Sequence, residues 1–228
     1  MAGKSPGVDD TARIFLRPIG TPLALGLFAV TVQSTMLAAM ELGWISPQEG
    51  TTVAITGLAF AFPLQLIASV LAFLARDAVA GTALAIFAGT WAVSSLAMLT
   101  SPPGATSDAV GIFLILAAIL LACVMVTGAV AARKLIVGLV LAFGSTRLVV
   151  TALFEIKESS GLETAAGILG LWLAAVALYA GLALLLEDAG RKTLLPTLRG
   201  GAAREAVTDG LPGQVSDVAN EAGVRQQL

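Results

Sequence analysis

Residues 17–27 read Arg-Pro-Ile-Gly-Thr-Pro-Leu-Ala-Leu-Gly-Leu and lead from a polar N-terminal segment into the first long apolar segment. No charged residue follows until Glu41, so a helix of roughly 20 or more apolar residues can form here, enough to cross a bilayer. Pro22 suits the first turn of that helix, because the N–H that proline lacks would have no partner there. By itself, the stretch predicts a membrane helix that begins at a proline.

The composition extends this prediction to the whole chain. Of its 228 residues, 57% are hydrophobic and 12% are charged, and the mean hydropathy is +0.91. A soluble domain has about 45–50% apolar and about 25% charged residues. The chain carries more apolar surface than it can bury within itself in water. We therefore expect an integral, multi-pass protein of the cell membrane, with the lipid bilayer as its first partner.

The same composition excludes several functions. The formal net charge of −2 gives no clustered basic face, which argues against nucleic acid as a partner. The chain has no His, and Cys123 is its single cysteine, so His-based metal sites and an internal disulfide are excluded. Cys123 lies in an apolar run and is typical of a small core residue. The sequence contains no phosphate loop and no nucleophile elbow. We expect no metal, no cofactor and no enzymatic activity.

Six long apolar segments are separated by short polar turns, which predicts an all-α membrane protein with six transmembrane helices. Pro63 lies inside the second segment and should kink its helix, because the proline ring removes a backbone hydrogen bond. We expect a disordered or interfacial segment over 1–17, a six-helix domain over 18–196 and a disordered cytoplasmic tail over 197–228. The expected helices span about 22–45, 51–75, 79–99, 109–131, 135–154 and 164–186.

The distribution of cations predicts the orientation of the six helices. Lys and Arg are enriched in cytoplasmic loops. The alternate loops hold only Lys157, which acidic residues outnumber. Both termini are therefore predicted to be cytoplasmic. The cations on the predicted cytoplasmic side are Lys4, Arg13, Arg17, Arg76, Arg133, Lys134, Arg191, Lys192 and Arg199.

Three motifs, in order along the chain, resemble the acetate uptake transporter family (YaaH type). The first lies at the start of the first helix, where the following residues match the family signature: Pro22, Leu25, Gly26, Leu27 and Ala29. Thr21 there replaces an Asn, and Leu23, Ala24 and Val30 also depart from the signature. The second motif places Gln65 and Trp91 at the family's spacing, but Ala72 replaces its Glu. The third is the ending Gly190-Arg191 followed by Leu195-Pro196, with Tyr179 close to a Tyr of the family's sixth helix.

The resemblance covers about 18–196 and implies more than hydropathy does. It implies a fold similar to urea-channel-like proteins, assembled as a homo-oligomeric hexamer in which each protomer has its own path. It also implies a channel or transporter for small carboxylates such as acetate or succinate, with or without proton coupling. The loss of the family's Asn, Pro and Glu leaves an alternative, a non-transporting membrane scaffold or assembly protein that retains the fold.

Arg147 is the most distinctive candidate functional residue. It lies thirteen residues beyond Lys134, which places it roughly 20 Å into the membrane at about 1.5 Å per residue. An ionisable group at that depth faces a cavity or a partner. One interpretation is an anion-attracting group on a carboxylate path. The other is structural: an ion pair with Glu41 or Glu155, or a side chain that snorkels outward.

Uncharged polar and aromatic residues form a second candidate set. A permeation path needs a few hydrogen-bond donors and an apolar constriction. The same residue types also make hydrogen bonds and packing contacts between membrane helices, and the sequence leaves both interpretations open. The set consists of Gln33, Gln65, Trp91 and Tyr179. Glycines within the helices, including Gly26 and Gly170, are predicted to let helices approach closely.

Overall fold

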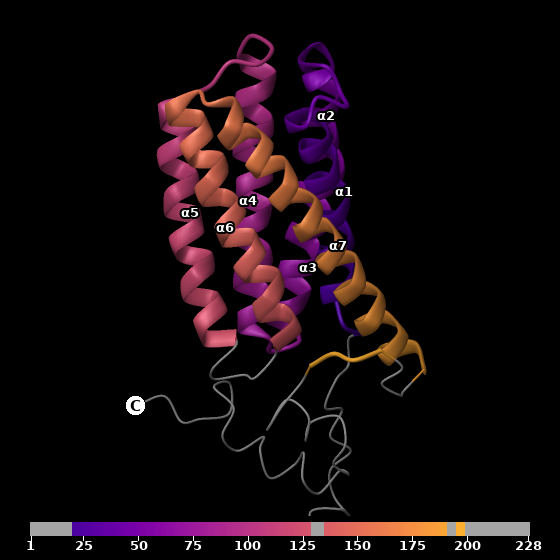
Figure 1. Cartoon of the computed structure of the whole chain (residues 1–228). Helices are drawn as coiled ribbons and strands as arrows, with labels where there is room; N and C mark the ends of the chain where they lie inside the picture. Colours follow the sequence, from indigo (N-terminus) through magenta and orange to yellow (C-terminus); the bar gives the residue numbers. More distant parts are fainter. Residues whose placement is uncertain (1–19, 129–134, 191–194, 199–228) are drawn as a thin grey trace, which may run out of the picture.

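The computed structural model describes residues 20–128, 135–190 and 195–198, and this part of the chain is a bundle of helices (Figure 1). Within the described residues, six helical segments are long and apolar enough to span a membrane, which confirms the all-α, six-helix prediction. The second span, Pro47–Leu74, contains four helical elements in succession, and each of the other five is a single helix. The elements are α1 (Leu23–Glu41), the 3₁₀ turn Pro47–Glu49, α2 (Gly50–Thr56), the π-helix Gly57–Ala61, α3 (Phe62–Leu74), α4 (Ala78–Thr100), α5 (Asp108–Val126), α6 (Leu135–Lys157) and α7 (Ser160–Gly190).

The six spans form a closed ring of neighbouring helices. Helix α7 packs against α1 on one side and α6 on the other, and α6 continues the ring to α5. Helix α5 contacts α4, α4 contacts α3, and α3 returns to α1. The core therefore has contributions from every span, and it is built mainly of Ala and Leu. Membrane helices associate without a hydrophobic driving force between them. Small side chains let the helices approach closely and so increase their packing contacts.

The first helix begins where the sequence predicted. Pro22 is the N-cap residue of α1, and its carbonyl accepts a hydrogen bond from the Gly26 N–H at 3.4 Å. Gly26 lies on the buried face of α1, and a Cβ atom at this position would collide with the Leu84 side chain of α4. Gly26 therefore makes the close interhelical contact that its motif suggested.

The second span is interrupted at the point where the sequence contains Pro63. Residues Gly57–Ala61 are π-helical, and the Phe62 N–H bonds the Gly57 carbonyl five residues earlier. A proline ring collides with the carbonyl four residues before it in a regular α-helix. The wider π turn directly before Pro63 is consistent with the need to avoid that collision. Prolines and π-bulges are both recognised sources of irregularity in long helices.

Side chains in the turns cap the starts of two helices. The Asp77 carboxylate accepts from the Ala80 N–H at 3.1 Å at the start of α4, and the Ser107 hydroxyl accepts from the Val110 N–H at 3.4 Å at the start of α5. Between α6 and α7 the chain reverses within Glu158 and Ser159, and Glu158 has a φ of 53°. This turn is tighter than the sequence suggested, so α7 begins four residues earlier than expected. Helix α7 also ends four residues later than expected.

The outer surface of the bundle is apolar. Large hydrophobic side chains on every span are at least one-third exposed, as expected for a surface that faces lipid or neighbouring copies. Examples are Val70, Leu96, Leu116, Leu139 and Leu182. Cys123 is also exposed on this surface, which corrects its interpretation as a core residue. The predicted disordered or interfacial segment at 1–17 and nearly all of the predicted tail at 197–228 lie outside the described residues.

Helix α1 begins and α7 ends at the same end of the bundle (Figure 1). We expect that end to be cytoplasmic, as the loop cations predict. In a variant that lacks Cys123, single cysteines introduced as Ser5→Cys and Gly210→Cys should both react with an impermeant thiol reagent only from the cytoplasmic side. Trp44→Cys is the control, because Trp44 is 66% exposed in the turn at the opposite end of α1. Labelling of residues 5 and 210 from opposite sides would refute the topology.

Candidate functional site

Polar side chains are buried in the core of the bundle. They come from α1, α3, α4 and α6, and each is at most 3% exposed. Polar groups in a low-dielectric interior are costly unless they are bonded, so each needs a partner or a reason to lack one. These residues are Gln33, Ser34, Gln65, Ser69, Thr90, Ser95 and Arg147.

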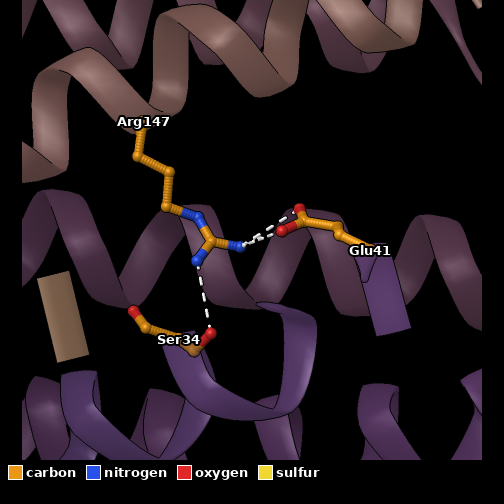
Figure 2. Close-up of polar contacts among 3 residues, drawn as sticks. All are labelled: Ser34, Glu41 and Arg147. Carbon is orange, nitrogen blue, oxygen red and sulfur yellow. Dashed lines mark hydrogen bonds and ion pairs between the residues drawn. The ribbon is translucent and has the colours of Figure 1, made fainter. Parts of the chain in front are cut away.

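Arg147 of α6 forms a buried ion pair with Glu41, the last residue of α1 (Figure 2). Its Nη2 atom donates to both carboxylate oxygens of Glu41, at 3.0 and 3.1 Å, and its Nη1 atom donates to the Ser34 carbonyl at 3.2 Å. The Arg147 and Glu41 side chains are 3% and 7% exposed. The three hydrogen bonds use only the two terminal nitrogens, so the Nε atom takes no part in them.

Two glycines of α7 leave room for this ion pair. A Cβ atom at Gly170 would overlap the guanidinium of Arg147 and would lie 3.0 Å from the Cβ of Ala38. A Cβ atom at Gly167 would lie 3.2 Å from the Cβ of Glu41. The guanidinium is therefore enclosed by backbone and small residues of α1 and α7. The sequence suggested that these glycines serve packing, but it did not connect them with Arg147.

Glu155, the other acid considered as a partner of Arg147, is engaged elsewhere. Its carboxylate accepts from the Ser107 N–H at 2.8 Å, at the start of α5. Glu155 follows Arg147 by eight residues on the same helix, which separates them by about 12 Å along the axis. Glu41 reaches Arg147 because it comes from a different helix at the same depth.

Gln33 holds the irregular second span against α1. Its amide nitrogen donates to the Val53 carbonyl at 3.2 Å, and its amide oxygen accepts from the Thr56 hydroxyl at 3.0 Å. A Cβ atom at Gly57 would collide with the Ser95 hydroxyl and would lie 3.0 Å from the Gln33 amide nitrogen. Both ends of the Gln33 amide are therefore used between helices, directly before the π-helix.

Gln65 connects α3 to the first-helix motif. Its amide nitrogen donates to the Gly26 carbonyl at 3.3 Å, while its amide oxygen is buried and has no hydrogen-bond partner within the described part of the chain. In the rest of the motif Leu27 is buried, Thr21 is partly buried and Leu25 is 36% exposed on the outer surface. Gly26 and Gln65 thus form a contact between the first and the second motif of the family resemblance, which the sequence had not predicted.

Trp91 of α4 lies in the core and stacks on Phe87, with ring centroids 6.1 Å apart and an interplanar angle of 15°. Phe87 in turn occupies the space where a Cβ of Gly144 would lie. Trp91 is 3% exposed, and its indole Nε1 is a buried donor without a partner among the described residues. A buried N–H that lacks an acceptor is rare enough to require an explanation.

Tyr179 lies apart from the other candidates. It is 40% exposed on α7, and its hydroxyl donates to the Pro196 carbonyl at 3.0 Å. In the single protomer it lies on the outer surface and ties the chain after α7 back onto that helix. Of the five predicted path residues, the structure therefore buries four and exposes Tyr179.

Buried polar atoms that have no partner among the described residues occur at several depths in the bundle. A helix rises about 1.5 Å per residue, which gives the depth of each residue from the end of its helix at the termini side of the bundle. The Gln65 amide oxygen belongs to a residue nine positions before the end of α3 and is about 14 Å deep, and the Ser34 hydroxyl is about 16 Å deep. The Trp91 Nε1 atom is about 20 Å deep, and the Thr151 hydroxyl is about 24 Å deep. Over the described residues, no three His, Cys, Asp or Glu side chains gather as metal ligands.

The fold and the buried polar groups together define a six-helix membrane protein with a partly polar interior. No family model matches the sequence, and no curated protein is significantly similar to it. The fold is similar to that in a solved structure of the bacterial acetate channel SatP. The TM-score is 0.69 at 18% identity, and the match covers 78% of this chain and 99% of that chain. This finding confirms the fold that the resemblance to the acetate uptake transporter family implied.

Proposed function

We propose that this protein is a membrane channel or transporter for small carboxylates such as acetate. The observation that carries the proposal is the similarity in fold to an acetate channel, which spans 99% of that channel's chain. The ordered sequence motifs support the same function independently. We expect the homo-oligomeric hexamer that the resemblance implies, located in the cell membrane.

The unpartnered polar atoms of the core support a path through the protomer. Donors and acceptors that lack protein partners can bind water or a passing solute, whereas a sealed core would leave them unsatisfied at a cost of about 1–3 kcal/mol each. Trp91 supplies a donor and Gln65 an acceptor, each from a different helix. A carboxylate needs donors along its route, and the Trp91 N–H is a donor to which no acceptor in residues 20–128, 135–190 or 195–198 is bonded.

The alternative is a membrane scaffold that retains the fold without transport. It is favoured by the replacement of the family's Asn and Glu by Thr21 and Ala72. Uptake of labelled acetate into proteoliposomes, with and without an imposed proton gradient, separates the two functions. If the protein is a transporter, acetate uptake should exceed that of protein-free liposomes and should saturate as the acetate concentration rises. Background uptake by a correctly assembled protein would favour the scaffold.

We expect Trp91→Phe to reduce acetate flux about tenfold, which corresponds to the loss of one hydrogen bond worth about 1.4 kcal/mol. Phenylalanine keeps the stacking on Phe87 and removes only the N–H, so assembly and thermal stability should change little. Trp172→Phe is the matched control, because Trp172 is 59% exposed on α7. Equal flux in the two variants would show that the Trp91 N–H does not contact the solute.

A further inference from the structure

We propose that Arg147 is the carboxylate-binding residue of the protomer, and that Glu41 is a resident counter-ion which the substrate carboxylate displaces. The proposal rests on the proposed function, which it makes more specific. Glu41 already presents to Arg147 the chemical group that an acetate-like solute would present. The observed ion pair thus corresponds to the state without substrate.

The stability of the bundle does not by itself require a buried ion pair. A buried pair pays a desolvation cost, and replacing both partners by apolar residues of similar volume is often neutral or stabilising. This chain instead places Gly170 against the guanidinium and directs the Ser34 carbonyl to Nη1. Ionisable groups inside membrane helices are otherwise rare and mark solute pathways. The space left for a cation at this depth therefore indicates a role beyond packing.

The geometry leaves the guanidinium able to bind another carboxylate. Both oxygens of Glu41 contact the same nitrogen, Nη2, instead of forming the two parallel bonds that make arginine–carboxylate pairs strongest. The hydroxyl of Ser34, whose carbonyl bonds Nη1, is buried and has no hydrogen-bond partner among the residues that the structure describes. This hydroxyl is an additional donor for an oxyanion in the same region. An incoming carboxylate could therefore gain hydrogen bonds that Glu41 does not make.

The Glu41 side chain can move toward solvent when the substrate displaces it. It is the last residue of α1, and the next turn contains Gly43 and Trp44, which are both exposed. The displaced carboxylate would reach water at this end of the bundle, while the substrate anion balances the charge of Arg147. The other charged groups near Glu41 are Glu155 and Glu163, which disfavour a second uncompensated anion there. Exchange of one carboxylate for another keeps the interior neutral at each step.

Glu41→Gln tests the exchange, because it leaves Arg147 without its anion. We expect this variant to lose thermal stability and to regain it as potassium acetate is added, with a smaller response to potassium chloride at equal ionic strength. The Glu41→Gln/Arg147→Gln double variant should show no acetate-specific response. Glu158→Gln is the control for removal of an acid at the same end of the bundle, since Glu158 is exposed and accepts a hydrogen bond from the Thr106 hydroxyl.

Flux provides the second measurement. The double variant has no buried charge to leave unpaired, so it should fold, yet we expect its acetate flux to fall about tenfold or more, as for loss of a charge-assisted hydrogen bond. If the wild-type protein carries acetate and the double variant carries it equally fast, Arg147 does not bind the substrate, although the proposed function stands. If acetate fails to stabilise Glu41→Gln more than the double variant, the exchange site is refuted. If the wild-type protein carries no acetate, it is the proposed function that fails.

Discussion

Gly26→Leu should prevent stable assembly of the bundle. The Cα of Gly26 lies so close to α4 that even a Cβ atom would collide with the Leu84 side chain. The same residue offers its carbonyl to the Gln65 amide, which ties α1 to α3. A leucine side chain would separate three helices at this point and break that hydrogen bond. We expect a loss of about 3 kcal/mol or more, the upper part of the range for overpacked cores.

The measurement is the yield of monodisperse protein in detergent and its thermal unfolding. Gly89→Leu is a matched control, because Gly89 also lies within a membrane helix and a Cβ atom there would meet nothing within 4 Å. The control substitution should leave yield and stability near the wild-type values. If Gly26→Leu assembles as well as Gly89→Leu does, the close approach of α1 and α4 is not required.

The number and position of the spans could be predicted because the bilayer imposes one strong constraint. Each span must be a helix of about 20 apolar residues, and charged turns such as Arg76-Asp77 mark its ends. Helix ends were less predictable, since α7 continues to Gly190 through Glu187 and Asp188. The π-helix at Gly57–Ala61 could not be derived either: Pro63 signals an irregularity, but tertiary contacts such as those of Gln33 decide its form.

The candidate site was predictable as a list of residues and not as an arrangement. The cost of a charge at mid-membrane depth identified Arg147, and depth alone left both Glu41 and Glu155 as partners. The choice between them depends on helix rotation and on which helices are neighbours. Close contacts such as that of Gly170 with Arg147 and Ala38 depend on both properties, and no periodic pattern encodes them. Tyr179 illustrates the same limit, since its distance along the helix did not reveal that it faces outward.

Arg147→Gln should destabilise the bundle by about 3–5 kcal/mol, the typical effect of removing one partner of a buried ion pair. The substitution leaves Glu41, 7% exposed, without its cation in the interior of the bundle. Glu41→Gln should have a similar effect for the converse reason, because a guanidinium stays protonated even when it is buried. Glu41→Gln keeps the side-chain length, so the lost charge is its main change. Glutamine is shorter than arginine, so Arg147→Gln removes the hydrogen bonds of the Nη1 and Nη2 atoms together with the charge.

The Glu41→Gln/Arg147→Gln double variant should recover part of that loss. Two amides carry no net charge to desolvate, so the free energy of unfolding of the double variant should exceed that expected from the sum of the single effects. The coupling between residues in contact is typically about 0.5–3 kcal/mol, and thermal or denaturant unfolding of all four proteins in a carboxylate-free buffer would measure it. Additive losses would mean that the two groups stabilise the fold independently. The ion pair between α1 and α6 would then be a contact without an energetic consequence, and it could not act as an exchangeable unit.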